Sequence, residues 1–391
     1  MVWRVYLGLT MRGALGPELD VSAGTLSQTV NEHDTLSVTF SRASLAGVGR
    51  EWWSYRSGCL VATYTDAHGV ERIISACPIS GAPVEDHRAG TVTLEGRGVG
   101  WLLEDRIILD RDYTADDFTD LRTGKVAGTS PHSWSAVIGR IIQSAIEGKR
   151  QGHLPLLYPS IYTAGDHSYS WDNWDLANNG AWARIHEVLE ADDGPDMMIR
   201  AEWVDGNHTQ FRWRAIVGTD EQRTIPQDDE LYLDGTVPGS DVATVEVASD
   251  PSTVCHRVYA TGAGEGRAVA MGFYEMKSIP EYMPLVERVH SDTGIQRDAT
   301  DGTSKALTKA AKSQIVTSAI EELSISVNAD PTRLPIGTWW CAESALVRLA
   351  DWLTVPDGEY RVRMIAVNYT LGSDMVSIDC QEQKLGEDYQ W

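Results

Sequence analysis

Apolar and polar residues alternate along short runs in the first quarter of the chain, which is the pattern of strands with one buried face. Two such runs, Gly58–Asp66 and Val70–Cys77, are separated by a short turn that contains a glycine, and we interpret them as a β-hairpin. Further alternating runs occur at Thr35–Ser41 and Thr91–Glu95. We therefore expect residues 1–105 to form a β-rich domain.

Between residues 106 and 240 the periodicity changes to that of helices. The pair Ser130–Pro131 suits a helix N-cap followed by a proline in the first turn. Hydrophobic residues at helical spacing then define one apolar face: Trp134, Val137, Ile138, Ile141, Ile142 and Ala145. A second helix is predicted over Ala181–Ala191, and a hairpin over Met197–Val204 and Thr209–Val217. We interpret this part as a smaller α+β domain.

The last third of the chain combines both patterns. Val254–Met271 predicts a strand, a turn with three glycines and a second strand. A helical run is expected over Gly302–Glu322, and the strand Leu323–Asn328 follows it. Two further strands, Glu359–Thr370 and Met375–Gln381, precede a short acidic tail that we expect to have little fixed structure without a partner.

The chain has 391 residues and a formal net charge of -23. Such a charge argues against binding nucleic acid through its phosphates and against docking on an anionic membrane. The five cysteines include no C-x-x-C pair, so we expect neither a disulfide framework nor a zinc ribbon, and assembly in a reducing cytoplasm. The apolar run at the N-terminus is interpreted as a strand, and no apolar stretch has the length of a membrane span.

Two motifs resemble chemical sites but lack a necessary part. Gly262, Gly264 and Gly266 follow a strand, as in a phosphate-binding loop, but a second strand and not a helix is predicted after them. His186 and Glu190 approach the H-E-x-x-H pattern of zinc proteases, but no third ligand is indicated. We therefore predict no metal site and no cofactor, and a cell-wall hydrolase is the least favoured function.

A loop of about thirty residues, Gly148–Asn179, is longer than ordinary connections, which favours a functional role or local structure. Its segment Tyr158–Asp175 is rich in residue types that stack on sugar rings and bind hydroxyl groups, and that also mediate protein interfaces or pack locally. The candidate contacts for a partner or a glycan are Tyr169, Trp171, Asp172, Trp174 and Asp175. Asp166, Asp172 and Asp175 would also offer the paired carboxylates of a glycosidase, although solvated aspartates are the simpler interpretation.

Strands, turns and one helix follow one another in an order that is typical of one family. They are Thr91–Ile107, Arg257–Gly266, Ala306–Glu322, Leu323–Asn328, the spaced pair Leu334 and Gly337, Arg361–Tyr369 and Met375–Cys380. This pattern resembles the tail hub proteins of long-tailed bacteriophages, minor tail proteins of the baseplate-hub family that are related to the N-terminal part of tail-associated lysins. The pair Trp339–Trp340 and the tryptophan-rich loop depart from the family pattern.

The resemblance implies two tube-like β-barrel domains, residues 1–105 and 241–391, with the smaller α+β domain at residues 106–240 between them. The second barrel would carry the helix at 302–322 and the acidic tail. The implied function is a structural, non-enzymatic ring at the tail tip of the virion, commonly a homotrimer that is assembled in the host cytoplasm. Its partners would be the distal tail protein ring, the tape-measure protein and tail fibre or receptor-binding proteins. DNA would pass through the lumen without specific binding, and a receptor- or glycan-binding tail protein is the alternative.

Overall fold

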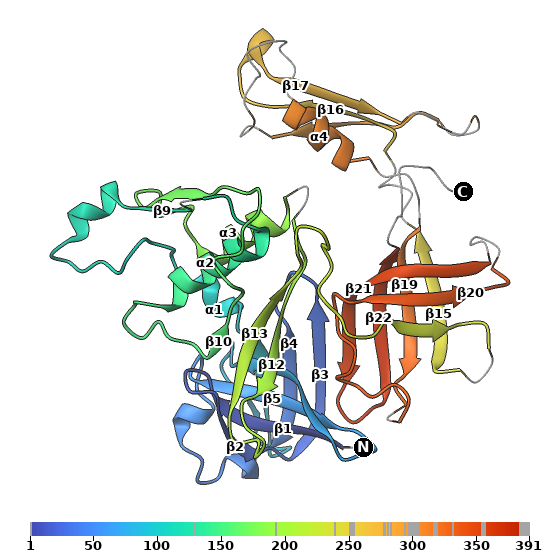
Figure 1. Ribbon diagram of the computed structural model, residues 1–391. Coiled ribbons are helices and arrows are strands. Elements are labelled where there is room, and N and C mark those ends of the chain that lie inside the picture. Colours follow the sequence, from blue (N-terminus) through green and yellow to red (C-terminus); the bar gives the residue numbers. More distant parts are fainter. Residues whose placement is uncertain are drawn as a thin grey trace. The chain divides into compact units, whose positions relative to one another are not determined.

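The computed structural model shows a β-rich α+β chain, with 42% of residues in strands and 15% in helices. Two compact units are present, residues 1–245 with 325–380, and residues 246–324 with 381–391 (Figure 1). The predicted division after residues 105 and 240 stays a prediction. The structure describes residues 2–128, 130–191, 194–237, 240–249, 255–276, 279, 281, 284–292, 295, 305–315, 320–330, 332–352 and 357–382. In these ranges no helix is both long and apolar enough to cross a membrane.

A large sheet, most of which belongs to the first unit, combines strands from both ends of the chain. Its order in the described part is β15, β19, β22, β21, β3, β4, β8 and β7, with β20 beside β21 and β14 beside β20. The bounds are β3 Val21–Thr29, β4 Thr35–Ser41, β7 Val84–Asp86, β8 Thr91–Arg97, β14 Leu231–Asp234, β15 Val242–Ser249, β19 Ile320–Asn328, β20 Ser344–Leu349, β21 Gly358–Thr370 and β22 Met375–Glu382. The predicted strands at 35–41, 91–95, 359–370 and 375–381 are therefore confirmed.

The 13-residue strand β21 joins the N-terminal and C-terminal strands of this sheet. Its first part, Gly358–Arg363, pairs antiparallel with β20, and its last part, Ala366–Thr370, pairs antiparallel with β3. The Ser27 hydroxyl donates to Asn368 Oδ1 at 2.6 Å across the second pairing. Within the described residues no closed barrel forms, so the two predicted tube-like barrels are not confirmed.

A four-stranded sheet of order β2, β1, β5 and β6 belongs to the same unit. Its strands are β1 Val2–Leu9, β2 Ala14–Glu18, β5 Gly58–Thr65 and β6 Glu71–Pro78. The predicted hairpin is confirmed as β5 and β6, which pair antiparallel. Seven of the eight residues of β5 are buried, because other elements cover both faces of this central strand and not one alone.

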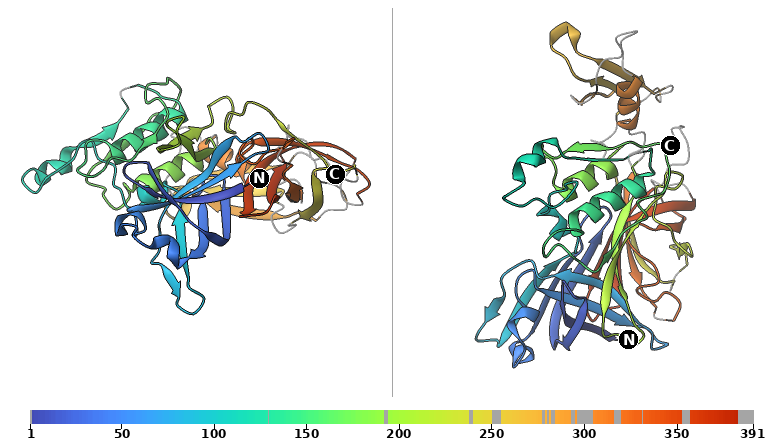
Figure 2. Two further views of the ribbon diagram at one scale, coloured as in Figure 1. Left: turned by 90° about the horizontal axis from the view of Figure 1, so that it is seen from below. Right: turned by 60° about the vertical axis from the view of Figure 1, so that its left-hand side comes forward.

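Helices and short strands form the remaining part of the first unit, with α2 and α3 side by side (Figure 2). The helices are α1 Trp101–Glu104, α2 Trp134–Ile146 and α3 Ala181–Leu189, and 3-10 turns lie at Arg42–Leu45, Arg50–Trp52 and Phe118–Thr123. The strands are β9 Lys125–Ala127, β10 Leu156–Leu157, β11 Ser170–Asp172, β12 Met197–Trp203 and β13 Phe211–Val217. The predicted hairpin of β12 and β13 is confirmed, and the buried Trp213 indole donates to the Ala76 carbonyl of β6 at 2.9 Å.

The predicted start of the first long helix at Ser130–Pro131 is wrong. The helix α2 begins at Trp134, and the hydroxyl of its N-cap Ser133 accepts from the Ala136 N–H at 3.3 Å. Before the cap, the backbone of His132 exchanges two hydrogen bonds with His167, which holds that residue in an extended bridge. The serine that satisfies a free N–H of the first turn therefore determines the start of the helix.

The second unit is a small sheet covered on one face by a helix. Its strands β16 Arg257–Thr261, β17 Met271–Glu275 and β18 Glu287–Ser291 have the order β17, β16, β18, and α4 Lys305–Ser313 packs on β16 and β17. The predicted strand, glycine turn and strand are confirmed by β16, the 3-10 turn Gly266–Ala268 and β17, although Val254 lies outside the described residues. The left-handed φ values of Gly264 (121°) and Gly266 (56°) explain the glycines of the turn.

The predicted helix over Gly302–Glu322 is wrong at its C-terminal end. The described helix α4 ends at Ser313, and strand β19 begins at Ile320, inside the predicted helical range. Residues 302–304 and 316–319 of that region lie outside the described residues. The alternating residues of β19 at Leu323, Ile325 and Val327 are buried in the large sheet, so tertiary pairing determines this segment more than helix propensity does.

A buried polar cluster lies where β3, β4 and β6 meet. The Asp34 carboxyl, next to the first residue of β4, accepts from the Ser75 hydroxyl at 2.5 Å and from Gln28 Nε2 at 3.2 Å. Burial raises the pKa of Asp34 to about 6, and the two hydrogen bonds only partly offset that rise. The folded protein therefore holds a proton on Asp34 that the unfolded chain loses near pH 4.

Asp34→Asn should increase the stability of the protein at pH 7.5 and have little effect at pH 4. Above pH 6 the wild type bears the cost of an ionised buried carboxylate, about 3 kcal/mol for a shift of about two pKa units. Denaturant unfolding at both pH values measures the difference. Asp116→Asn, at an exposed loop position, is the control, and an equal effect of Asp34→Asn at both pH values would contradict the prediction.

Candidate functional site

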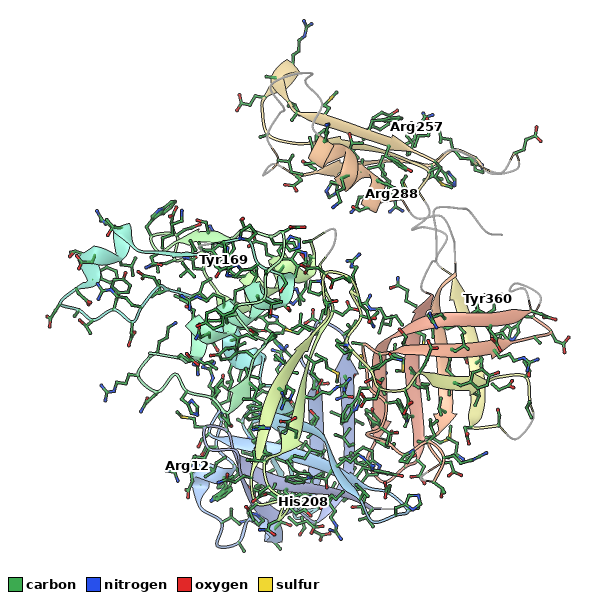
Figure 3. The ribbon with its side chains drawn as sticks, in the orientation of Figure 1. Arg12, Tyr169, His208, Arg257, Arg288 and Tyr360 are labelled. Carbon is green, nitrogen blue, oxygen red and sulfur yellow. The ribbon has the colours of Figure 1, made fainter. Side chains whose placement is uncertain are left out.

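The five predicted contact residues lie together in one groove of the helical part of the first unit. This groove has a volume of about 490 Å³. Its wall consists of Trp134, Val137, Ser168, Tyr169, Ser170, Trp171, Asp172, Trp174, Asp175, Arg184, Glu187, Val188 and Ala191. Figure 3 labels Tyr169 at this position, beside β9 and the helices. The loop that the sequence singles out and the two long helices thus form one concave surface.

Backbone pairing and buried amides hold the loop in place. Strand β11 pairs antiparallel with β9, with Trp171 opposite Val126. The fully buried Asn173 side chain donates to Asp110 Oδ1 at 2.5 Å and to the Tyr113 hydroxyl at 3.2 Å. Asn179, which is also buried, donates to the Asp172 carbonyl at 2.9 Å. The chain on both sides of Trp174 is therefore fixed by buried hydrogen bonds.

Most aromatic rings of the groove pack against one another. Trp171 is 8% exposed and stacks on Tyr169, with the two ring centroids 4.8 Å apart. The Arg184 guanidinium lies 5.8 Å from the centroid of the Trp171 ring. Trp134 stacks on His167 with centroids 3.7 Å apart. Burial raises the pKa of the Tyr169 hydroxyl, which is therefore neutral at physiological pH. Trp171 belongs to the hydrophobic core, and the partly buried Tyr169 and Trp134 pack against that core.

Trp174 differs from its neighbours because 62% of its side chain is exposed. The exposed Asp172 carboxylate has no hydrogen bond or ion pair among the described residues. Asp175 accepts from Asn178 Nδ2 at 2.8 and 3.1 Å, and the Glu187 carboxylate accepts from Arg184 Nη1 at 2.6 Å. The rim of the groove therefore offers one free aromatic face, several acceptors and one guanidinium.

The alternative catalytic residues do not assemble into a reactive site. His186 Nδ1 lies 3.6 Å from Glu190 Oε1, and His186 Nε2 lies 3.7 Å from Glu32 Oε1. Asp166 is exposed and does not line the groove of Asp172 and Asp175. Across the described ranges, no three His, Cys, Asp or Glu side chains are placed to hold a metal ion. The His186 and Glu190 pair thus has the geometry of a surface ion pair.

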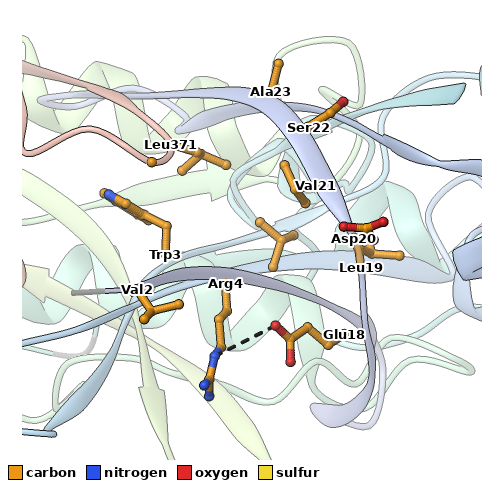
Figure 4. Close-up of a pocket in the computed structure, with 12 residues that line it drawn as sticks. Val2, Trp3, Arg4, Glu18, Leu19, Asp20, Val21, Ser22, Ala23 and Leu371 are labelled. Carbon is orange, nitrogen blue, oxygen red and sulfur yellow. Dashed lines mark ion pairs between the residues drawn. The ribbon is translucent and has the colours of Figure 1, made fainter.

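A second hollow of about 660 Å³ lies beside the first residues of β1 (Figure 4). Its wall includes Trp3, Arg4 and Glu18, together with residues at the start of β3. The Trp3 indole donates to the Ser373 carbonyl at 3.1 Å, and Arg4 lies 3.7 Å from Glu18. Since each of these polar side chains already has a partner within the protein, we assign no ligand to this hollow.

Sequence reasoning missed the part of the groove that the two helices contribute. Trp134 was assigned only to the apolar face of its helix, yet it also lines the groove. Arg184 and Glu187, three positions apart on α3, form an ion pair on the groove wall. The spacing of these two charges can be read from the sequence. The contact between α3 and the loop that precedes it in the chain cannot.

Comparison with solved structures relates this fold to tail proteins. A tail protein from Neisseria meningitidis MC58 matches with a TM-score of 0.53 and 11% identity, over 98% of this chain and 97% of that chain. The 43 kDa tail protein of prophage MuSo2 from Shewanella oneidensis matches with a TM-score of 0.54 and 10% identity, over 97% of each chain. A chain of the PdpA–VgrG complex of Francisella matches with a TM-score of 0.51 and 10% identity, over 100% of this chain and 59% of that one.

No protein-family model and no curated protein sequence matches the chain. The structural matches are therefore evidence of a shared fold at very low sequence identity. The predicted resemblance to phage tail proteins is confirmed at that level.

Trp171→Ala and Trp174→Ala should affect stability very differently. Removing the buried Trp171 ring leaves a cavity beneath Tyr169 and should lower the free energy of unfolding by about 3–5 kcal/mol. Removing the exposed Trp174 ring should change it by no more than about 0.5 kcal/mol. Denaturant unfolding monitored by circular dichroism measures both, and an equal loss of stability in the two variants would contradict the assigned burial.

Proposed function

We propose that this protein is a structural component of a long-tailed bacteriophage tail and forms the hub at the tail tip. The observation that carries the proposal is the fold, which it shares with two tail proteins over 97–98% of its own length and 97% of theirs. A structural match over that length includes both compact units of this chain. The β-rich architecture suits a part of a tube wall, because paired strands supply a continuous hydrogen-bonded surface.

In this proposal three copies form a ring whose two sets of strands act as tube-like barrels. The ring would contact the distal tail protein ring, the tape-measure protein, and tail fibre or receptor-binding proteins. The net charge of -23 supports passage of DNA, because an acidic lumen does not adsorb phosphates. The protein would be assembled in the host cytoplasm, would reside at the virion tail tip and would have no enzymatic activity of its own.

Electron microscopy and native mass measurement of the purified chain test the ring. We expect particles with three subunits and a central channel, because a hub must continue the tail tube. Antibody labelling of intact virions should mark the tail tip and no other position. A stable monomer without a channel, or labelling confined to the head, would contradict the hub function.

An exposed apolar row in the second unit supports contact with another subunit. Tyr259 of β16 lies opposite Phe273 of β17 and Val289 of β18, on the face away from α4. These side chains are 42%, 43% and 71% exposed. Neighbouring Val258 and Ala260 point to the other face, where they are buried under Leu307 of the helix. Contiguous apolar side chains on a sheet face are typical of assembly surfaces, and we propose a second copy as the occupant.

Val289→Lys should therefore weaken assembly of the ring, because it places a charge on the most exposed side chain of that row. Mass photometry over a dilution series measures the fraction of trimer, which should fall at equal protein concentration. Val84→Lys is the control, since Val84 is 66% exposed on β7 of the first unit and not in the row. If both variants remain as trimeric as the wild type, this face is not the assembly surface.

A second candidate function, binding of a receptor glycan, is favoured by the groove around Trp174. The two functions are compatible, because a hub exposes part of its surface on the outside of the tail.

A further inference from the structure

We propose that the groove around Trp174 is a carbohydrate site that takes neutral or amino sugars in their pyranose form. This inference rests on the second candidate function, binding of a receptor glycan, and names its class of sugar; it is independent of ring formation, which requires no sugar. It rests on one free aromatic face, on one unpaired carboxylate beside it, on the charge of the wall and on the rigidity of the loop. Each of these features favours a sugar over a protein partner.

The Trp174 side chain provides the stacking surface. It is 62% exposed, whereas Trp171 below it is 8% exposed and already stacked on Tyr169. Among the described residues Trp174 makes no ring contact of its own. An exposed indole that is fixed on both sides can cover the apolar C–H face of a pyranose ring while the sugar hydroxyls stay at the polar rim.

Polar groups at the rim suit the hydroxyl groups of such a ring. The Asp172 carboxylate is exposed and has no hydrogen-bond partner among the described residues. Asp175 and the Arg184–Glu187 pair stand in the same wall and add acceptors and donors. A sugar hydroxyl both donates and accepts, so it can bridge a carboxylate and a guanidinium without leaving either unpaired.

The charge of the wall selects among sugars. Three carboxylates, those of Asp172, Asp175 and Glu187, face a single guanidinium, that of Arg184. A polymer that carries phosphate or carboxylate groups would meet like charge, whereas neutral hexoses and amino sugars would not. We therefore exclude anionic glycans from the proposed class.

The loop is already ordered, which lowers the entropic cost of binding. Strand β11 is paired with β9, and the buried amides of Asn173 and Asn179 hold the backbone next to Trp174. A preorganised site loses less conformational entropy when a ligand binds. The centre of a protein interface is typically a cluster of several exposed aromatic or apolar anchors, whereas Trp174 is the one strongly exposed aromatic ring among the described residues that line the groove.

A glycan array tests the proposal with the purified full chain. The probes are neutral and amino-sugar oligosaccharides, namely gluco-, galacto-, manno- and chito-oligosaccharides, and two anionic ones, oligogalacturonate and sialyllactose. We expect binding to at least one neutral or amino-sugar probe and none to the anionic probes. Binding restricted to the anionic probes, or no binding at millimolar concentration, would overturn the inference.

Titration calorimetry with the best probe then tests the residues. Trp174→Ala should weaken binding by about tenfold or more, equal to about 1.4 kcal/mol, and Asp172→Asn should weaken it as well. Tyr162→Ala is the matched control, because Tyr162 lies in the same long loop, is 86% exposed and does not line the groove. Unchanged affinity in Trp174→Ala would overturn the site even if the array is positive. Trimer formation by all three variants separates this result from the hub function.

Discussion

The pairing of β21 with both β20 and β3 along its length is the constraint on which the first unit depends. The first half of this strand pairs with β20, and the second half pairs with β3. Without the second pairing, the N-terminal strands β3, β4 and β8 would present a row of free backbone groups to solvent, which is costly and favours aggregation. The hydrogen bond from Ser27 to Asn368 spans 341 positions of sequence and shows how remote the two partners are.

Local features of this fold were predictable from the sequence, and long-range ones were not. The β5 and β6 hairpin and the β16 turn follow from alternation and glycine spacing, which act over a few residues. The pairing of β3 with β21 leaves no local signal, because each strand alternates in the same way whichever partner it has. The helix predicted over 302–322 failed for a related reason, since the burial of Leu323 and Val327 in the large sheet depends on partners elsewhere in the chain.

The groove illustrates the same limit at the level of side chains. Composition identified the right loop, but it treated Trp171 and Trp174 as equivalent, although one is a core residue and the other is at the surface. In β11, which pairs with β9, Trp171 is buried between the exposed residues Ser170 and Asp172, whereas Trp174 lies beyond the end of that strand. Arg184 could not be assigned to the groove until the position of α3 was known. The groove is therefore determined by how β11 and α3 are placed in the fold more than by the residue types of the loop.

The position of β3 and β21 in the chain also has a consequence for synthesis on the ribosome. β3 emerges early, whereas its partner at 366–370 emerges more than three hundred residues later. Throughout that interval one edge of the N-terminal sheet lacks its native neighbour, and non-local strand pairing of this kind is slow to form. The nascent protein must therefore keep that edge from pairing with other chains, through a chaperone or through temporary contacts of its own, until translation has passed β21.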